Sequence, residues 1–387
     1  MIYTLKLYDT ALLRFSADEN ASDPQIQILW QTQEHPELLP LELDGTPDSL
    51  FRWLRRRAIP KNRAYVNTLL AKLSLSANRP MKIIDVCRGL SLNDSYWVTR
   101  EDFSGSFEKY NLYDNRFSQV LALLAFTGYG SSLVRTSLIS SPEMTTNGML
   151  PKCWRRIQGR ITLFKGGTTG ASNTGYEPYS EFYAAQIAQL MGINAIAYDL
   201  SKWKGILCST CELFTSKEVG FLPVGHVLTK GGIPAVEAYC AQLGAEYLEA
   251  LYDMYLLDAV LCNTDRHYGN FGFLIDSRTN RIIAPAPLFD HGNSLFNLAG
   301  RGDLESAEAL RAYADAQLPC VYDDFFEPAR QHLDARRRAM LRRLLTFRFR
   351  RHSRYNLPKE RLALIEGEVQ HRASVLLDGG AEADRTV

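Results

Sequence analysis

The sequence predicts an α+β fold in which a β-rich part precedes a mainly helical part. Two observations support this class. Before Thr215, short runs of β-branched, aromatic and aliphatic residues are bounded by turn-forming residues, which is typical of strands. From Ala235 to about Leu377, apolar residues recur at the spacing of a helix face. Helices are expected in this last part over the segments 305–317, 323–332, 335–347 and 359–376, followed by a small polar tail from residue 378.

Composition excludes several classes of protein. The chain has 387 residues, of which 46% are hydrophobic and 22% charged, and its net charge is +1. These values are typical of a soluble globular protein and give no general electrostatic case for binding nucleic acid or a membrane surface. No apolar run of about 18 residues predicts a membrane span, and the N-terminus lacks the pattern of a signal peptide. We therefore expect no membrane association.

Seven cysteines, an odd number in a long chain, argue against a disulfide framework and for a cytoplasmic location. Cys208 and Cys211 form a lone CxxC pair. Zinc would need two further ligands and no second pair is present, so we expect no structural metal.

The first 140 residues are expected to form a separate α/β region. Strands are expected at residues 4–8 and 25–30, and two helical patterns lie between 50 and 75, with Asp48-Ser49 as the N-cap and Pro60 as the break. A further helix is expected over 116–126. The Ser/Thr-rich stretch 131–146 is the expected boundary.

A glycine loop and a strand lysine follow this boundary. Gly148 lies in a loop that ends at Lys152, and Lys165 ends the expected strand 160–165. A glycine lets backbone N–H groups approach phosphate oxygens, and a lysine reaches the same oxygens as a point charge. Ordinary turns and surface strands contain the same residues. The segment is not a Walker A loop, because the lysine precedes the glycines.

The next helix, residues 177–192, carries Glu181 in its first turn. This glutamate could interact with the helix dipole or form an ion pair with Lys165. Strands are then expected at 193–200 and 204–214. The end of the second strand, from Glu212 to Phe214, would offer unpaired backbone groups to an adenine edge.

The most informative stretch is Asn263 to Gly272. A helix is expected over 245–261, then a loop from Asp265 to Asn270, and then a hairpin with strands 271–275 and 281–284 that returns the chain to Asp290. In phosphoryl transfer, one carboxylate accepts the proton of the attacking hydroxyl, while an Asn oxygen and a second carboxylate hold Mg²⁺. The pattern therefore predicts a phosphotransfer site, although a six-residue polar loop also arises by chance.

These motifs, taken in chain order, resemble those of the HipA-type kinases, the toxins of bacterial toxin–antitoxin pairs. The resemblance covers about residues 145–375 and is most specific over 263–290. It implies a two-lobed protein-kinase-like fold with a small β-rich N-lobe, a mainly helical C-lobe and an additional N-terminal α/β subdomain. The implied bounds are 1–140 for the N-terminal subdomain, 141–234 for the N-lobe, 235–378 for the C-lobe and 379–387 for a flexible tail.

The resemblance also assigns roles to single residues. Asp265 matches the catalytic base, and Asn270 and Asp290 match the magnesium ligands. His267 matches a histidine that shapes the loop. The residues that match the ATP-binding set are Gly148, Lys152, Lys165, Glu181, Glu212 and Phe214.

The chain departs from the family in two places. Gly269 stands where family members often carry a lysine before the metal-binding Asn, and Arg266 could supply that charge or shape the loop. The family's autophosphorylated serine, shortly before the loop glycine, has no counterpart. Thr145 and Thr146 are the nearest hydroxyls, with Ser140 and Ser141 further back.

The resemblance thus implies a serine/threonine protein kinase that uses ATP and Mg²⁺. It also implies a translation-related protein target, a small HipB-like antitoxin and, through it, operator DNA. Two alternatives stay open. Asp-Arg-His-x-x-Asn is also similar to the loop of phosphatidylinositol kinases, which would make the substrate a lipid. A nucleotide-binding pseudokinase that acts as an interaction module is the third possibility.

Overall fold

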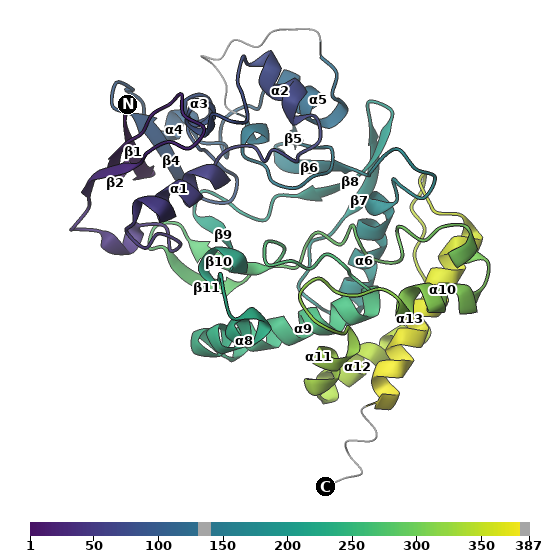
Figure 1. Ribbon diagram of the computed structural model, residues 1–387. Coiled ribbons are helices and arrows are strands. Elements are labelled where there is room, and N and C mark those ends of the chain that lie inside the picture. The colour runs from purple at the N-terminus through teal and green to yellow at the C-terminus, as the bar shows by residue number, and fades with distance from the viewer. Residues whose placement is uncertain (131–140, 380–387) are drawn as a thin grey trace. The chain divides into compact units, whose positions relative to one another are not determined.

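The computed structural model describes residues 1–130 and 141–379, which form two compact units (Figure 1). Unit 1 comprises Met1–Lys165, Glu212–Leu222 and Leu274–Ile283, and unit 2 comprises Gly166–Cys211, Pro223–Phe273 and the rest of the chain from Ala284. Residues 131–140 of the expected boundary stretch, which include Ser140, lie outside the described residues. The expected tail from residue 380 also lies outside them. The predicted domain bounds therefore remain a prediction.

An antiparallel sheet with the order β3-β2-β1-β4 opens unit 1. Its strands are β1 (Ile2–Leu7), β2 (Thr10–Ser16), β3 (Gln27–Gln31) and β4 (Tyr96–Arg100). Alternate residues of β1 are buried, as expected of a strand with one face on a core. The core opposite that face contains Trp53 and Met81. The β-rich start was predicted from the sequence, but β2 was missed.

The helices of unit 1 are α1 (Pro47–Arg56), α2 (Val66–Lys72), α3 (Pro80–Cys87), α4 (Phe107–Tyr110) and α5 (Gln119–Thr127). Helices on both sides of Pro60 were predicted. The predicted N-cap at Asp48-Ser49 was wrong, because Thr46 caps α1 by accepting from the backbone N–H of Ser49, at 3.2 Å. Pro47 follows as the first helical residue, where a missing N–H costs nothing.

A second sheet has the order β5-β6-β8-β7. Its strands are β5 (Lys152–Ile157), β6 (Arg160–Gly166), β7 (Asp199–Trp203) and β8 (Ile206–Glu212). Both tight turns, Gln158-Gly159 and Lys204-Gly205, have two consecutive residues with positive φ, the geometry that matches strand twist in a two-residue hairpin. β5 was not predicted.

The predicted strand 193–200 was wrong over most of its length. Its backbone bonds instead to a distant segment, with the N–H of Ile196 donating to Leu288 O at 2.8 Å and that of Leu288 donating to Asn194 O at 2.9 Å. Only the last residues of the predicted range belong to β7. This exchange of bonds fixes the chain two residues before Asp290.

The third sheet has the order β11-β10-β9, with β9 at Val219–Pro223, β10 at Gly272–Asp276 and β11 at Arg281–Pro285. The hairpin formed by β10 and β11 was predicted to within a residue at each end, whereas β9 was missed.

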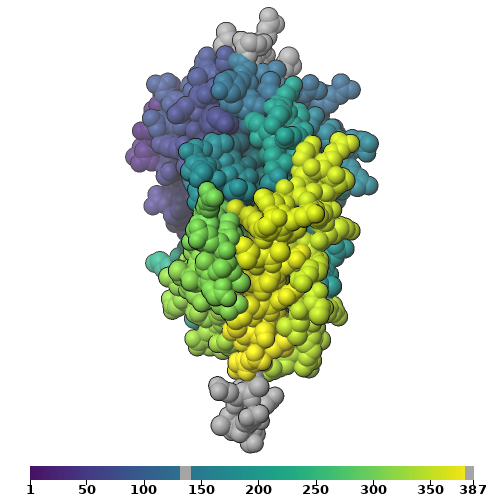
Figure 2. Space-filling model, turned by 90° about the vertical axis from the view of Figure 1, so that its right-hand side faces the viewer, coloured from purple at the N-terminus to yellow at the C-terminus, as the bar shows by residue number. Residues whose placement is uncertain are grey.

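Unit 2 is mainly helical. Its helices are α6 (Glu177–Met191), α7 (Val224–Val227), α8 (Gly232–Leu243), α9 (Ala245–Leu261), α10 (Ala307–Asp315), α11 (Phe326–Gln331), α12 (Ala335–Leu344) and α13 (Lys359–Gly379). Helix α9 packs against α8, α11 and α13, and its second half is buried on all sides. The C-terminal helices, coloured green to yellow, lie together on the face shown in Figure 2. Over the described residues, no helix has the length and hydropathy that crossing a membrane requires.

Candidate active site

The predicted catalytic loop begins where α9 ends. Cys262 adopts a left-handed conformation with φ 52°, and Asp258, one turn earlier, is buried. The side-chain amide of Asn263 donates to Asp258 Oδ1 at 3.0 Å, and Asn263 Oδ1 accepts from the backbone N–H of Asp265 at 3.1 Å. Asn263 therefore fixes the loop to the helix and sets the position of the half-buried Asp265.

Asp265 and Asn270 lie at the two ends of one closed loop. The Asn270 side-chain amide donates to the backbone oxygen of Asp265 at 2.9 Å, which leaves Asn270 Oδ1 as the atom that can bind a cation. Inside the loop, His267 Nδ1 accepts from the N–H of Gly269 at 3.0 Å. The exposed His267 ring is thus bonded to the backbone of the loop, and its loop-shaping role remains a prediction.

The segment after Asp290 reaches the same loop. The Asn293 amide donates to Asp265 Oδ2 at 3.1 Å, and the Asn293 backbone oxygen accepts from the N–H of Thr264 at 3.0 Å. Asn293 thereby orients the carboxylate of the predicted base. Sequence reasoning missed this residue, and its position three residues after Asp290 was the only available signal.

Arg266 joins both predicted metal-ligand segments. Its Nη1 donates to Asn270 O at 3.0 Å and to Phe289 O at 2.7 Å. Its Nη2 lies 3.0 Å from His291 Nδ1. Asp258 receives the remaining bonds, at 3.0 Å from Nε and 3.1 Å from Nη2. The Arg266 side chain is completely buried, so it orders the loop and does not supply the exposed charge suggested for it.

Asp290 has a left-handed backbone with φ 58°, a conformation that few residues other than glycine adopt and that aspartate tolerates better than most. Its N–H donates to the hydroxyl oxygen of Tyr198 at 3.1 Å. Burial raises the pKa of Tyr198 well above its usual range, so this hydroxyl stays protonated. Tyr198, also missed from the sequence, therefore helps to hold Asp290 in this conformation.

Unit 1 contains the predicted phosphate-binding residues. Lys152 of β5 and Lys165 of β6 are directly opposite in the register, and both are buried. Opposite side chains on an antiparallel pair lie on the same face of the sheet, about 5 Å apart. Gly148 has φ +92°, a backbone conformation that residues with a side chain rarely adopt, so a substitution there would be strained. These three residues suit a polyanion such as a nucleotide phosphate.

A buried ion pair anchors this loop. Arg63 Nη2 lies 2.8 Å from Glu143 Oε2, and both side chains are fully buried. The same nitrogen donates to Lys152 O at 2.8 Å, while Glu143 Oε1 accepts from the N–H of Trp154 at 2.8 Å. Burial raises the pKa of Glu143 and Arg63 opposes that shift. The pair holds both ends of the Gly148 loop.

Three further residues were predicted to bind the nucleotide. In unit 2, Glu181 is fully buried in α6 and accepts from the Ser209 hydroxyl. In unit 1, Glu212 ends β8, and its exposed side chain forms an ion pair with Arg160. The Phe214 ring packs edge-on against Phe221, with centroids 5.5 Å apart.

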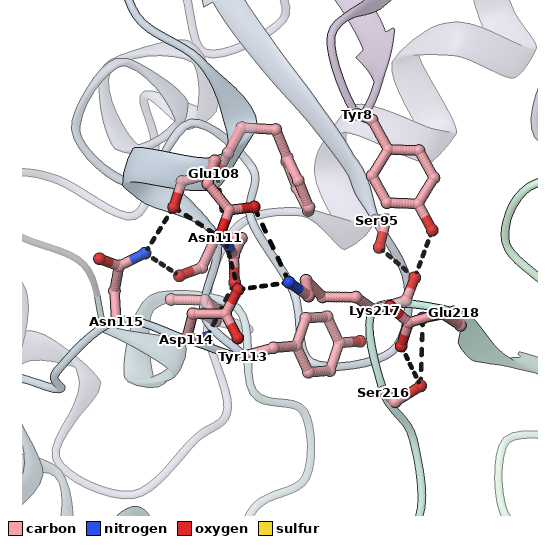
Figure 3. A network of polar contacts seen from close by, with 12 residues as sticks. Tyr8, Ser95, Glu108, Asn111, Tyr113, Asp114, Asn115, Ser216, Lys217 and Glu218 are labelled. Atoms are coloured by element: carbon pink, nitrogen blue, oxygen red, sulfur yellow. Dashed lines mark hydrogen bonds and ion pairs between the residues drawn. The ribbon is translucent and has the colours of Figure 1, made fainter.

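The segment after Phe214 is bound to the N-terminal sheet (Figure 3). The hydroxyls of Tyr8 and Ser95 both donate to the backbone oxygen of Lys217, at 2.6 and 2.7 Å. The Lys217 ammonium lies 2.6 Å from Asp114 and 3.8 Å from Glu108. The chain that leaves the predicted adenine-binding position is therefore held by residues more than 100 positions earlier.

The Thr145 and Thr146 hydroxyls, considered for autophosphorylation, are both hydrogen-bonded. Thr145 is buried and donates to Leu90 O at 2.7 Å. Thr146 is half-buried, donates to Pro142 O at 2.7 Å and accepts from Trp154 Nε1 at 3.1 Å. Autophosphorylation at either threonine remains a prediction.

The donor set also bears on the metal. Among the residues that the structure describes, no three His, Cys, Asp or Glu side chains are grouped to hold an ion. Asn270 and Asp290 offer two hard oxygen ligands, which suits Mg²⁺, an ion that completes its shell with water and phosphate oxygens. The residues present thus fit Mg²⁺ that arrives with a nucleotide.

Comparison with known proteins supports the fold. No protein-family model matches the chain. The HipA in a Shewanella oneidensis complex of HipA, HipB and operator DNA aligns over 98% of this chain and 99% of its own, with 13% identity and a TM-score of 0.56. The predicted resemblance to HipA is therefore confirmed at the level of the fold.

Helicobacter pylori supplies two further matches. A serine/threonine-protein kinase, CtkA, is 29% identical over 132 residues, which are 30% of this chain and 40% of that protein. The crystal structure of a proinflammatory kinase CtkA aligns over 60% of this chain and 95% of its own, with 18% identity and a TM-score of 0.48. The chain thus matches less than half the length of its curated relative.

Proposed function

We propose that this protein is a serine/threonine protein kinase of HipA type that uses ATP and Mg²⁺. One observation carries the proposal: the buried Arg266 bonds to Asn270 and to both neighbours of Asp290, while Asn293 orients Asp265. A catalytic carboxylate and two oxygen ligands for Mg²⁺ are what phosphoryl transfer needs. The partial match to a serine/threonine kinase agrees with this chemistry.

In the proposed reaction, the Asp265 carboxylate accepts the proton of a substrate Ser or Thr hydroxyl. The hydroxyl oxygen bonds to the γ-phosphorus, the bond from that phosphorus to the β–γ bridging oxygen breaks, and ADP leaves. Asn270 and Asp290 would hold Mg²⁺, which neutralises charge on the phosphates. Lys152 and Lys165 bind the phosphates, and the backbone of Glu212 and Phe214 binds the adenine.

The test compares the wild-type protein with Asp265→Asn. Both are incubated with radiolabelled ATP and either casein-like proteins or vesicles that contain inositol lipids. We expect labelled protein, no labelled lipid and a loss of rate of at least about 100-fold in the variant. Asp23→Asn, at an exposed position, is the matched control. Equal labelling by wild type and Asp265→Asn would exclude this mechanism, and binding of MgATP without turnover would identify a pseudokinase.

The toxin role extends the proposal. The Shewanella oneidensis protein is found in a complex with HipB and operator DNA. We propose a corresponding small antitoxin for this chain, and a translation-related protein as its substrate. Expression of the wild type should arrest bacterial growth, whereas expression of Asp265→Asn should not. If the wild type and Asp265→Asn both arrest growth, the arrest does not depend on kinase activity.

A further inference from the structure

A cavity of about 340 Å³ adjoins the predicted catalytic loop within unit 2. Its walls include Leu228, Val236 and the Tyr268 side of the loop, and Thr229 and Lys230 lie at its rim. Ligand pockets span about 300–1,000 Å³. This cavity is therefore at the small end of the range, and it suits one large side chain better than a whole nucleotide.

The cavity wall is tied to the catalytic loop by the backbone. The N–H of Gly225 donates to Tyr268 O at 2.9 Å, and the N–H of Val224 donates to Phe271 O at 3.0 Å. A Cβ on Gly225 would lie 2.9 Å from Tyr268 Cβ, so the two segments are in direct contact. The wall of the cavity is thus bonded to the loop that carries Asp265.

The sequence limits how far the cavity lies from Asp265. Tyr268, which lines the cavity, is three residues from Asp265, and three residues of chain span at most about 10 Å. A peptide whose hydroxyl lies at Asp265 can therefore place a residue about two to four positions away in the cavity.

The positive charge of Lys230 indicates a second property of the group that the cavity binds. Lys230 lines the cavity and is exposed. Gly231 and Gly232 follow, with φ +93° and +60°, and turn the chain into α8 immediately after the lysine. An exposed cation beside an apolar cavity favours a ligand that has an apolar group next to an acidic one.

We propose that this cavity is a specificity subsite for the protein substrate. It takes an apolar or aromatic side chain close to the phosphorylated Ser or Thr, and Lys230 contacts an acidic side chain beside it. The proposal rests on the proposed kinase function and adds the sequence preference of that kinase.

The test uses the full chain and a Ser/Thr peptide library in which each position near the acceptor is varied in turn. We expect selection of an apolar residue at one position, two to four residues from the acceptor, with an acidic residue beside it. Thr229→Trp, which fills the cavity from its rim, should raise the KM for the selected peptide about tenfold or more. Lys230→Glu should raise it about fivefold and reverse the acidic preference.

Controls separate the outcomes. Lys359→Glu reverses an exposed charge in the first turn of α13, where a negative charge is tolerated, and should leave the peptide KM unchanged. Phosphorylation of peptides without any such selection would overturn the proposed subsite but not the proposed kinase function. The same holds if Thr229→Trp raises the KM for ATP alone. If the wild type phosphorylates no peptide or protein, both proposals fail.

Discussion

Arg266 is the residue on which the candidate catalytic centre depends most. Its five N–H groups form a rigid fork that can satisfy several acceptors at once, and here they reach the Asp258 carboxylate, two backbone oxygens and a histidine ring. Lysine, with its ammonium at one point, could not span them. Burial raises the pKa of Asp258, and the Arg266 charge lowers it. Each charge therefore offsets part of the desolvation cost of burying the other.

Replacement of Arg266 by Met should therefore destabilise the protein by about 3–5 kcal/mol, since it leaves the Asp258 carboxylate buried without a counter-charge. Urea denaturation would measure the loss. The double variant Asp258→Leu/Arg266→Met should recover part of that stability but not kinase activity, because the Asn270 and Phe289 oxygens still lack their donor. Full activity in the double variant would contradict a positioning role for Arg266.

At the scale of elements, the segment 214–218 owes its position to the N-terminal sheet. Lys217 O accepts from Tyr8 and Ser95, and Thr215 Oγ1 donates to Leu92 O at 2.5 Å. Downstream, the N–H of Phe221 donates to Asn93 O at 2.7 Å. The proposed adenine contact, immediately before this segment, is thus supported from residues at the start of the chain.

The double variant Tyr8→Phe/Ser95→Ala removes both donors to Lys217 O. We expect a loss of about 1–3 kcal/mol, faster amide exchange over residues 214–218, and weaker MgATP binding. Tyr129→Phe, at a highly exposed tyrosine of the same unit, is the control. Unchanged exchange over 214–218 would show that the two hydroxyls do not hold the segment.

Helix α13 carries a titrating group. Burial raises the pKa of Glu368 from 4.5 to about 7, although Arg372 and Arg311 lower it and Asp315 raises it further. Because its folded-state pKa is raised, the group destabilises the protein progressively as pH rises from about 4.5 to about 7. Glu368→Gln mimics the protonated acid and should raise the Tm at pH 8, with the difference vanishing near pH 4.5. An equal change in Tm at both pH values would exclude this titration.

For the molecule as a whole, the sequence predicted what depends on local periodicity. Helix α9 and the hairpin after it were predicted because an uninterrupted apolar helix and two short strands around a turn have clear patterns. β5 was missed because lysine and arginines occupy three of its six positions.

The sequence predicted which chemical groups the candidate site contains, but not how these groups are bonded or buried. Asp265, Asn270 and Asp290 follow a recognisable spacing, but Asn293 and Tyr198 act through hydrogen bonds between distant segments. Arg266 appeared as an available charge, and only the fold shows that it is buried. Spacing reveals which groups are present, whereas tertiary contacts decide which of them are exposed and what they orient.

The N-terminal region is joined to the later segments of unit 1 by several hydrogen bonds, so it does not form a separate module. Besides Lys217, it binds the hairpin between β10 and β11, where the Asn280 amide donates to Glu37 O and Leu39 O at 3.0 and 2.6 Å. Removal of residues 1–140 would take away the acceptors of Asn280 and would expose Trp154, Ile161 and Leu213, which pack against the apolar core around Trp97. We therefore expect the fragment 141–387 to lack cooperative thermal unfolding and to bind MgATP at least about tenfold more weakly than the full chain, measured by calorimetry. A fragment that unfolds cooperatively and binds with full affinity would show that the N-terminal region is a separate module, free to bind a partner.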